Sequence, residues 1–470
     1  MRDRPRSHWR EQGPALAEPA PAEEAPSAEA PSADPAPTPP PPNKPPKPRP
    51  QGAGRRPLPS DLATISQTFQ VCACGHCGSK DLLARDVEEA VRLDVVERAA
   101  RIRQELREVV RCKSCGRTTT ADGPSLPCER SKFTCAFLAW LVTMRFQLLV
   151  PINRIRRLLS SQGVDTSKST LIRCFELASN LCDAVDGEHW KQLLAEKCLH
   201  TDGTGLKVRI EGLDEAWPAV LDVFTNGAVF VYQFVLTKHA DLLADVLERF
   251  KGVLLCDAES RLNEICEKEG VRRAACNAHP RREFRDAESA QPILAKEAGS
   301  FYARMYAIER AMAREGIRGE ERLRRRQRDT RPIADAFHAW LILHKDLLPT
   351  DPLGKVVRYC LNHWESLTVF IDDPNVPIDN NSSDRAFQDH ARLRFNSLFA
   401  GSTEGGHRWA VLLGVASTAR RLGLDLQAYL TWMFERRGTR KNEFGLTAAQ
   451  LTPAAYKLML DEQGQERVAA

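Results

Sequence analysis

The spacing of hydrophobic and polar positions divides the chain into regions of different character. Residues 1 to about 60 are rich in Pro, Ala and Glu, and we expect a disordered head with stiff polyproline stretches. From 131 to 185, apolar positions recur at helical spacing, and from Cys198 the spacing changes to that of strands. Helical, charged sequence returns at 285 to 365 and again near the C-terminus.

The region that begins at Cys198 predicts three strands, a helix, a strand, a helix and a last strand. The predicted strands are 199–210, 217–224, 228–236, 252–257 and 273–276, and the predicted helices are 240–250 and 259–268. This order matches a ribonuclease-H-like core, in which the first and fourth strands lie side by side. We therefore predict an α/β multidomain chain with such a core at 195–424, a helical insertion at about 287–365 and a C-terminal helical element at 425–470.

Residues 129–190 predict a helix-turn-helix. Pro151 opens its second helix, Gly163 lies in the turn, and Thr166 or Ser167 can cap the third helix. An ordinary helical hairpin is the alternative, but basic and small polar residues fall together on the exposed side, which favours DNA binding. The residues predicted to meet phosphates and base edges are Ser167, Lys168, Ser169 and Arg173.

Two Cys-x-x-Cys pairs, each followed by Gly, predict a zinc-binding module at 61–128. Such pairs suit two turns that present thiolates to one tetrahedral Zn²⁺, and four thiolates leave no open position, so the zinc would be structural. Cys72 or His76 could substitute at the first pair, and four free thiols are the alternative. The assigned ligands are Cys74, Cys77, Cys112 and Cys115.

Composition and charge bear mainly on where the protein is found in the cell. The net charge of +5 is too small to indicate a nucleic-acid partner by itself. No apolar run approaches the ~20 residues of a membrane helix, and the N-terminus lacks an apolar signal core, so we expect a soluble cytoplasmic protein with no membrane partner. A dense basic run at 322–331 is either a solvated helix face or, in a DNA enzyme, a set of phosphate contacts.

Two aspartates stand in apolar, strand-like segments. Asp202 lies in the first strand, and Asp257 ends the fourth. A carboxylate at such a place is costly to desolvate unless it is paired or holds a cation, and two on neighbouring strands could bind a divalent metal. A solvated strand-end Asp is the alternative for either one. We expect a third carboxylate on a later helix, and Asp384 falls in the first turn or two of one.

Three motifs, at 200–205, 276–282 and 377–386, give the chain a family resemblance. With the cysteine pairs, they resemble the TnpC-type DDE transposases of the insertion-sequence sixty-six family. The resemblance implies catalysis by Asp202, Asp257 and Asp384, which would hold two Mg²⁺ (or Mn²⁺) ions for end cleavage and strand transfer. The family's third acidic residue is usually Glu followed by Arg. Asp384 is one methylene shorter, which implies reduced activity, or a DNA-binding relic or repressor that keeps the zinc and helix-turn-helix modules.

The resemblance implies further residues and partners. Cys276 and His279 match an accessory Cys-x-x-His feature, for which a buried thiol and a hydrogen-bonded His are the alternative. The expected phosphate contacts are Arg281, Arg282 and Arg385. The implied partners are double-stranded DNA (element ends and target), further copies of the chain on paired ends and accessory proteins of the same element, in the nucleoid. A nuclease of this fold without strand transfer is a rival.

Overall fold

The computed structural model describes residues 109–111, 118–120, 123–210, 212–236, 247–257, 262–267, 269–397 and 400–469. Its first strands, β1 (Val109–Arg111) and β2 (Thr118–Thr120), form an antiparallel pair. The predicted head at 1–60 and the predicted zinc ligands Cys74, Cys77, Cys112 and Cys115 lie outside these residues. Within the part of the chain that the structure describes, every helix is too short or too polar to span a bilayer.

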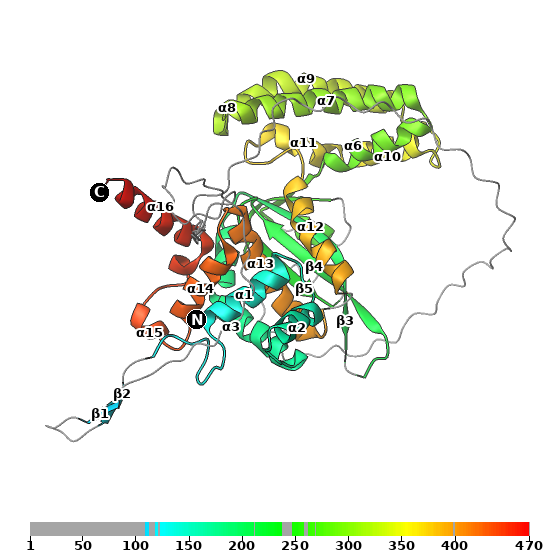
Figure 1. Ribbon diagram of the computed structural model, residues 1–470. Helices are drawn as coiled ribbons and strands as arrows, with labels where there is room; N and C mark the ends of the chain where they lie inside the picture. Colours follow the sequence, from blue (N-terminus) through cyan, green and yellow to red (C-terminus); the bar gives the residue numbers. More distant parts are fainter. Residues whose placement is uncertain are drawn as a thin grey trace, which may run out of the picture. The chain divides into compact units, whose positions relative to one another are not determined.

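A five-stranded mixed sheet forms the centre of the fold, in the order β5-β4-β3-β6-β7 (Figure 1). Its strands are β3 (Cys198–Arg209), β4 (Ala216–Thr225), β5 (Phe230–Val235), β6 (Gly252–Cys256) and β7 (Val271–Ala275). β3 pairs antiparallel with β4 and β4 with β5, whereas β6 runs parallel to both β3 and β7. The prediction that the first and fourth strands lie side by side is confirmed by the β3–β6 pairing.

Helices cover both faces of this sheet, and β6 shows why. Leu254 and Cys256 pack with Trp190 in one hydrophobic core, whereas Val253 and Leu255 pack in a second core on the opposite face. Successive side chains of a strand point to opposite faces, so a strand buried on both sides reads as a continuous apolar run. The run Val253-Leu254-Leu255-Cys256 has this character.

Three helices precede the sheet: α1 (Cys135–Phe146), α2 (Ile152–Ser161) and α3 (Lys168–Leu194). The Ser167 hydroxyl caps α3 by accepting a hydrogen bond from the Thr170 backbone amide at 3.1 Å. This confirms one of the two predicted caps. α3 continues for 27 residues, and its last turns bring Trp190 and Leu193 against the sheet. Because α3 is continuous, its contact with the sheet at one end also sets the position of its first turns.

A helical region lies between β7 and α12, and its last helix packs against β7. The short helix α5 (Asn263–Cys266) precedes β7. The helices that follow β7 are α6 (Ala278–Asp286), α7 (Pro292–Arg314), α8 (Gly319–Arg325), α9 (Arg331–Leu343), α10 (Pro352–Asn362) and α11 (Trp364–Asp372). Figure 1 shows α7 and α9 side by side, with α6, α10 and α11 beneath them. Phe337 packs edge-on against Phe284 and Tyr302 at the centre of this region.

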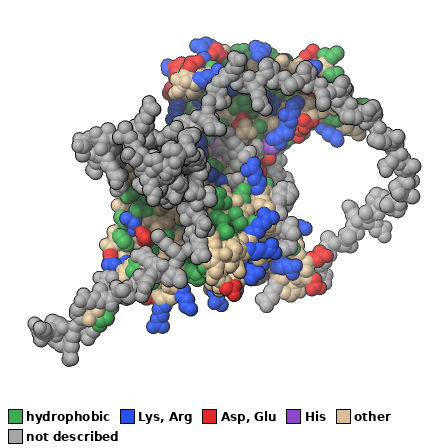
Figure 2. All heavy atoms as spheres, in the orientation of Figure 1, with side chains coloured by type: hydrophobic (Ala, Val, Ile, Leu, Met, Phe, Trp, Pro, Cys, Tyr) green, Lys and Arg blue, Asp and Glu red, His purple; other side chains and the backbone are tan. Residues whose placement is uncertain are grey.

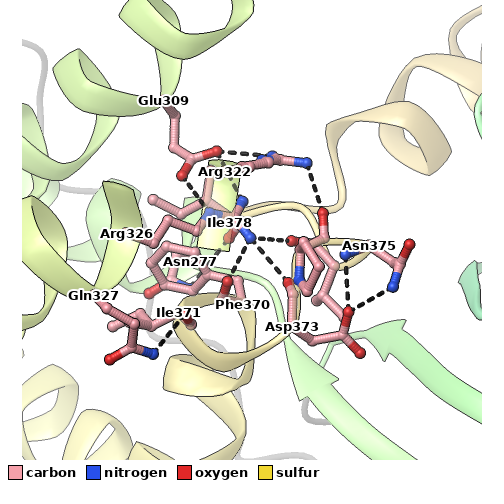
Figure 3. A network of polar contacts seen from close by, with 12 residues as sticks. Asn277, Glu309, Arg322, Arg326, Gln327, Phe370, Ile371, Asp373, Asn375 and Ile378 are labelled. Carbon is pink, nitrogen blue, oxygen red and sulfur yellow. Dashed lines mark hydrogen bonds and ion pairs between the residues drawn. The ribbon is translucent and has the colours of Figure 1, made fainter. Parts of the chain in front are cut away.

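A buried arginine holds this region to the loop that follows α11 (Figure 3). The Arg326 side chain is 0% exposed, and its guanidinium donates to the Glu309 carboxylate at 2.7 and 2.8 Å. It also donates to the carbonyl oxygens of Phe370, Asp373 and Val376. Arg322 binds the same carboxylate at 2.8 Å. Both interpretations of the basic run, a solvated helix face and phosphate contacts, are therefore wrong for Arg326, which is buried and paired, and the Arg322 charge is likewise paired with Glu309.

The remaining helices return to the sheet and to α1. They are α12 (Asn381–Asn396), α13 (Thr403–Arg421), α14 (Leu426–Arg437), α15 (Lys441–Phe444) and α16 (Pro453–Ala469). α12 lies against β3 and β4, α13 lies against β5, and α14 packs on α1. At Gly406, a Cβ atom would lie 2.5 Å from the Phe234 ring, so α13 approaches β5 at a distance that only glycine permits.

Candidate functional site

Asp202 and Asp257 reach the same level on the same face of the sheet. His200 pairs with Leu255 in the parallel register of β3 and β6, and each aspartate lies two residues further along its strand direction. Residues two apart on a strand share a face. Asp257 follows the strand end, and both aspartates are partly exposed. The two carboxylates that the sequence singles out thus come from neighbouring strands, on one face of the sheet.

Asn380 attaches the start of α12 to β3, beside Asp202. Its side chain is fully buried, and its Nδ2 donates to the Thr201 carbonyl oxygen at 2.8 Å. Its Oδ1 lies 3.1 Å from His200 Nδ1 and accepts from the Ser383 hydroxyl at 2.9 Å. Because an amide oxygen only accepts, His200 must carry its proton on Nδ1. Burial lowers the pKa of His200, which favours this neutral form.

The same asparagine also meets the end of β7. The Asn380 backbone amide donates to Cys276 Sγ at 3.2 Å, and the Cys276 amide donates to the Cys256 carbonyl oxygen at 3.2 Å. Hydrogen bonds therefore run from β3 through α12 to β7 and β6. Asp384 lies in α12 about one turn, ~5.4 Å of rise, beyond Asn380. The side chains of Asp384 and Arg385 are outside what the structure describes.

His279, in the first turn of α6, faces Asp257. Its Nδ1 lies 3.0 Å from Asp257 Oδ1. The pKa of His279 is raised to about 10, chiefly by Asp257 and then by Cys276, both of which favour the imidazolium. The geometry is nevertheless not that of an in-line hydrogen bond, since neither atom meets hydrogen-bond criteria with any described residue. The two buried atoms instead face each other at the distance of an ion pair.

The donor set fits divalent cations. Asp202 and Asp257 offer carboxylate oxygens, which Mg²⁺ and Mn²⁺ prefer. Asp257 Oδ1 is buried without a hydrogen bond from the described residues, as a ligand atom would be in the absence of its ion. Asp257, Cys276 and His279 each place one donor atom within 4.8 Å of the others.

The predicted DNA-facing residues of α3 are all exposed. Ser167, Lys168, Ser169 and Arg173 lie on the open side of the helix. Three more exposed cations were not predicted from the sequence, because the α2 segment was interpreted from its apolar residues alone. Arg154, Arg156 and Arg157 are exposed around the buried Ile155 and Leu159. Lys and Arg side chains gather on the lower right of the face that Figure 2 shows.

Two further predicted phosphate contacts lie on α6, beside His279. Arg281 and Arg282 are exposed, and the Arg281 guanidinium lies 4.6 Å from the centre of the Tyr306 ring. This cation–π contact holds Arg281 in place while leaving its hydrogen-bond donors available. Cations therefore occur close to the aspartates as well as on α2 and α3.

α12 also connects the two areas. Its first turn is bound at Asn380, and at its other end Asn396 Nδ2 donates to the Leu149 carbonyl oxygen at 3.2 Å. The buried Arg145 of α1 donates to the Ser397 hydroxyl at 2.6 Å and lies 5.0 Å from the centre of the Trp409 ring. One helix thus spans from the aspartates to the segment that joins α1 and α2.

Comparison with known proteins places this arrangement in a family. The sequence profile described as "Transposase IS66 family" matches residues 130–408. The chain is 27% identical to the uncharacterized protein y4hP of Sinorhizobium fredii (strain NBRC 101917 / NGR234), over 81% of this chain and 74% of the relative. It is 28% identical to the uncharacterized protein y4jD of the same strain, over 81% and 77%. With more than half of its length matched, the chain belongs to the IS66 family of transposases.

Proposed function

We propose that the chain is the transposase of an insertion sequence and carries out metal-dependent cleavage of the element's ends and their transfer to target DNA. The observation that supports this most directly is the set of bonds made by Asn380. They bring the start of α12, which carries Asp384, to β3 beside Asp202 and to Cys276 at the end of β7. We infer that Asp384 then lies close enough to Asp202 and Asp257 to complete the acidic set.

The observed strand order supports the proposed assignment of the core fold. Three antiparallel strands followed by two parallel ones, in the order β5-β4-β3-β6-β7, are those expected of a ribonuclease-H-like core at 195–424. α2 and α3, with their exposed cations, would form the helix-turn-helix within 129–190. The zinc-binding module at 61–128 stays a proposal from its cysteine spacing.

In the proposed mechanism, Asp202, Asp257 and Asp384 hold two divalent cations, Mg²⁺ or Mn²⁺. Bound there, the ions would supply the Lewis acidity that activates a water or a 3′-hydroxyl and stabilises the leaving oxygen. Asn380 fixes the backbone of α12 relative to β3, so that the third carboxylate starts from a set position. His279 shares the Asp257 carboxylate and orients it.

The proposed DNA contacts form two sets, one close to the aspartates and one on α2 and α3. Arg281 and Arg282, with Arg385, would bind phosphates of the strand being cut. The exposed side of α3, with α2, would bind the element end in its major groove. We propose that copies of the chain act together on paired ends, with accessory proteins of the same element.

Cleavage of the element's own end DNA tests this function. We expect purified protein with Mg²⁺ or Mn²⁺ to nick the end and to form a joined end–target product. Asp202→Asn and Asp257→Asn should each abolish both products, because each removes an anionic ligand. Asp214→Asn is the matched control, since Asp214 is an exposed aspartate of the turn between β3 and β4.

Each of the other outcomes would indicate a different function or a different set of catalytic residues. Specific binding of end DNA without cleavage in either metal would indicate a DNA-binding relic or repressor. Cleavage without a joined product would indicate a nuclease. Cleavage that survives Asp202→Asn and Asp257→Asn would overturn the assignment of the acidic residues.

A further inference from the structure

We propose that Asp257, Cys276 and His279 form a second kind of metal site, which binds a borderline-soft ion of the Zn²⁺ class through one oxygen, one sulfur and one nitrogen. The three side chains come from the end of β6, the end of β7 and the first turn of α6. They lie together because β6 and β7 are parallel neighbours and α6 begins two residues after Cys276.

The distances suit a small tetrahedral ion. One donor atom from each residue lies within 4.8 Å of the other two, and His279 Nδ1 is 3.0 Å from Asp257 Oδ1. Nitrogen and oxygen ligands at ~2.0–2.1 Å from a tetrahedral Zn²⁺ would be roughly 3.3 Å apart. The carboxylate and the imidazole are thus already near ligand spacing, and the sulfur lies within 4.8 Å of both, so small side-chain rotations would bring the three donor atoms to one ion.

Two buried atoms support a ligand between these side chains. Asp257 Oδ1 and His279 Nδ1 are both out of contact with water, and neither makes a proper hydrogen bond with the described residues. Buried polar atoms are otherwise satisfied almost without exception. Two unsatisfied donor atoms that face each other at 3.0 Å are explained if a cation belongs between them.

The sulfur is held as metal-bound thiolates are. Cys276 is fully buried, and its Sγ accepts the backbone amide of Asn380 at 3.2 Å. Outer hydrogen bonds of this kind orient a ligand before the metal arrives. His279 and Asp257 stay 27% and 35% exposed, so an ion can reach the site from solvent and a fourth position can hold water.

The ligand chemistry separates this site from the one proposed for catalysis. Mg²⁺ prefers six oxygen ligands and binds sulfur poorly, whereas Zn²⁺ accepts oxygen, nitrogen and sulfur in a four-ligand shell. Asp257 is common to both sites, and its carboxylate would be drawn toward Cys276 and His279 when Zn²⁺ binds. If the proposed function holds, Zn²⁺ would compete with the ions needed for cleavage.

Cobalt spectroscopy of the full-length protein tests the site without DNA. Protein freed of metal with a chelator is titrated with Co²⁺, which reports a bound thiolate by a near-ultraviolet charge-transfer band and tetrahedral geometry by intense visible bands. We expect wild type to show both. Cys276→Ser should lose the charge-transfer band of this site, and His279→Gln should weaken Co²⁺ binding by at least about tenfold.

Cys135→Ser is the matched control, because Cys135 is a buried thiol in α1, outside the cluster. Its spectrum should match wild type, and thermal unfolding should show that all variants are folded. Any thiolates of the N-terminal cysteine pairs are common to all variants and cancel in the difference. Equal bands and equal affinity in wild type, Cys276→Ser and His279→Gln would overturn the proposal. That result would leave the DNA cleavage assay unaffected, so the two failures are distinguishable.

Discussion

The Asn380 side chain donates to the carbonyl oxygen of Thr201 at 2.8 Å, and this bond joins the start of α12 to the strand residue beside Asp202. Asparagine has two amide hydrogens and one carbonyl oxygen, and here both kinds of group face β3. The bond sets where α12 begins along β3. Further along, Arg394 donates to the Gly205 carbonyl oxygen at 2.6 Å, so the helix follows the strand.

Asn380→Ala should reduce end cleavage by roughly 100-fold or more, because a small displacement of a catalytic group is enough for such a loss. It should also lower the free energy of unfolding by about 1–3 kcal/mol, since His200 and Ser383 lose a buried partner. Urea unfolding and a cleavage time course measure the two effects.

Asn375→Ala is the control for this change. Asn375 lies in the same connecting segment, but it is exposed and bonds only within its own turn, to Asp373. We expect near-normal stability and cleavage. A similar loss of cleavage in both variants would mean that the segment as a whole, rather than Asn380, positions α12.

Asp384→Glu should raise end cleavage by roughly 10- to 100-fold, because the added methylene carries the carboxylate further from the helix backbone. Asp384→Asn should abolish cleavage, since it keeps the length and removes the charge. The two substitutions thus test reach and charge separately at one position. If Asp384→Glu has no effect and Asp384→Asn stays active, the third acidic residue lies elsewhere.

Glu309→Gln should destabilise the protein by about 3–5 kcal/mol, because it leaves the buried Arg326 charge without its carboxylate. Burial opposes ionisation of Glu309, but the bonds from Arg326 and Arg322 outweigh it and hold its pKa below the usual range. The double variant Glu309→Met with Arg326→Met should cost less than Glu309→Gln alone. Chemical denaturation of the three proteins gives the comparison.

Glu315→Gln provides the surface counterpart. Glu315 pairs with Arg325 in the same helical region, but the Glu315 side chain is 50% exposed to solvent. Exposed pairs contribute little, so we expect almost no change in the denaturation midpoint. Equal effects of Glu309→Gln and Glu315→Gln would show that burial does not decide the strength of these pairs.

Acid should loosen α12 through His390. This side chain is fully buried in α12, and burial, with a smaller contribution from the Arg394 charge, lowers its pKa from 6.5 to about 4. The unfolded chain binds a proton below about pH 6.5, whereas the folded chain does so only near pH 4. The stability that neutral His390 contributes is therefore present above pH 6.5 and is lost as the pH falls toward 4.

His390→Leu removes this titration. Between pH 7.5 and pH 5, the variant should lose about 2 kcal/mol less free energy of unfolding than wild type. His189, which burial also lowers to a pKa of about 4, remains in both proteins and contributes equally. Parallel pH profiles for the two proteins would contradict the assignment to His390.

The local sequence pattern was sufficient to predict the strands and the cap of α3. The run from Val253 to Cys256 is apolar because both sheet faces are covered, and Ser167 caps α3 through a bond only three residues away. Such signals depend on neighbours in the sequence. The adjacency of β3 and β6 followed from the order of elements.

Contacts between distant segments could not be read in this way. Asn380 lies within the motif at 377–386 and has no local signal that reveals its partners, which lie in β3 and directly after β7. Arg326 stood in a run of cations that read as a surface feature, because its carboxylate partner Glu309 is on another helix. Sequence shows that a charge exists, whereas burial and pairing depend on the packing of whole helices.

The two ends of the helical region meet. The Asn277 amide and side chain both donate to the Ile378 carbonyl oxygen, at 3.2 and 3.1 Å, across a stretch of about a hundred residues. Because the helical region begins and ends at the same place, it can lengthen, shorten or be exchanged during evolution without moving the segments before and after it. The number of residues between Asp257 and Asp384 is thus a poor guide to distance, and alignments of divergent relatives should anchor on Asn277 and Ile378 instead.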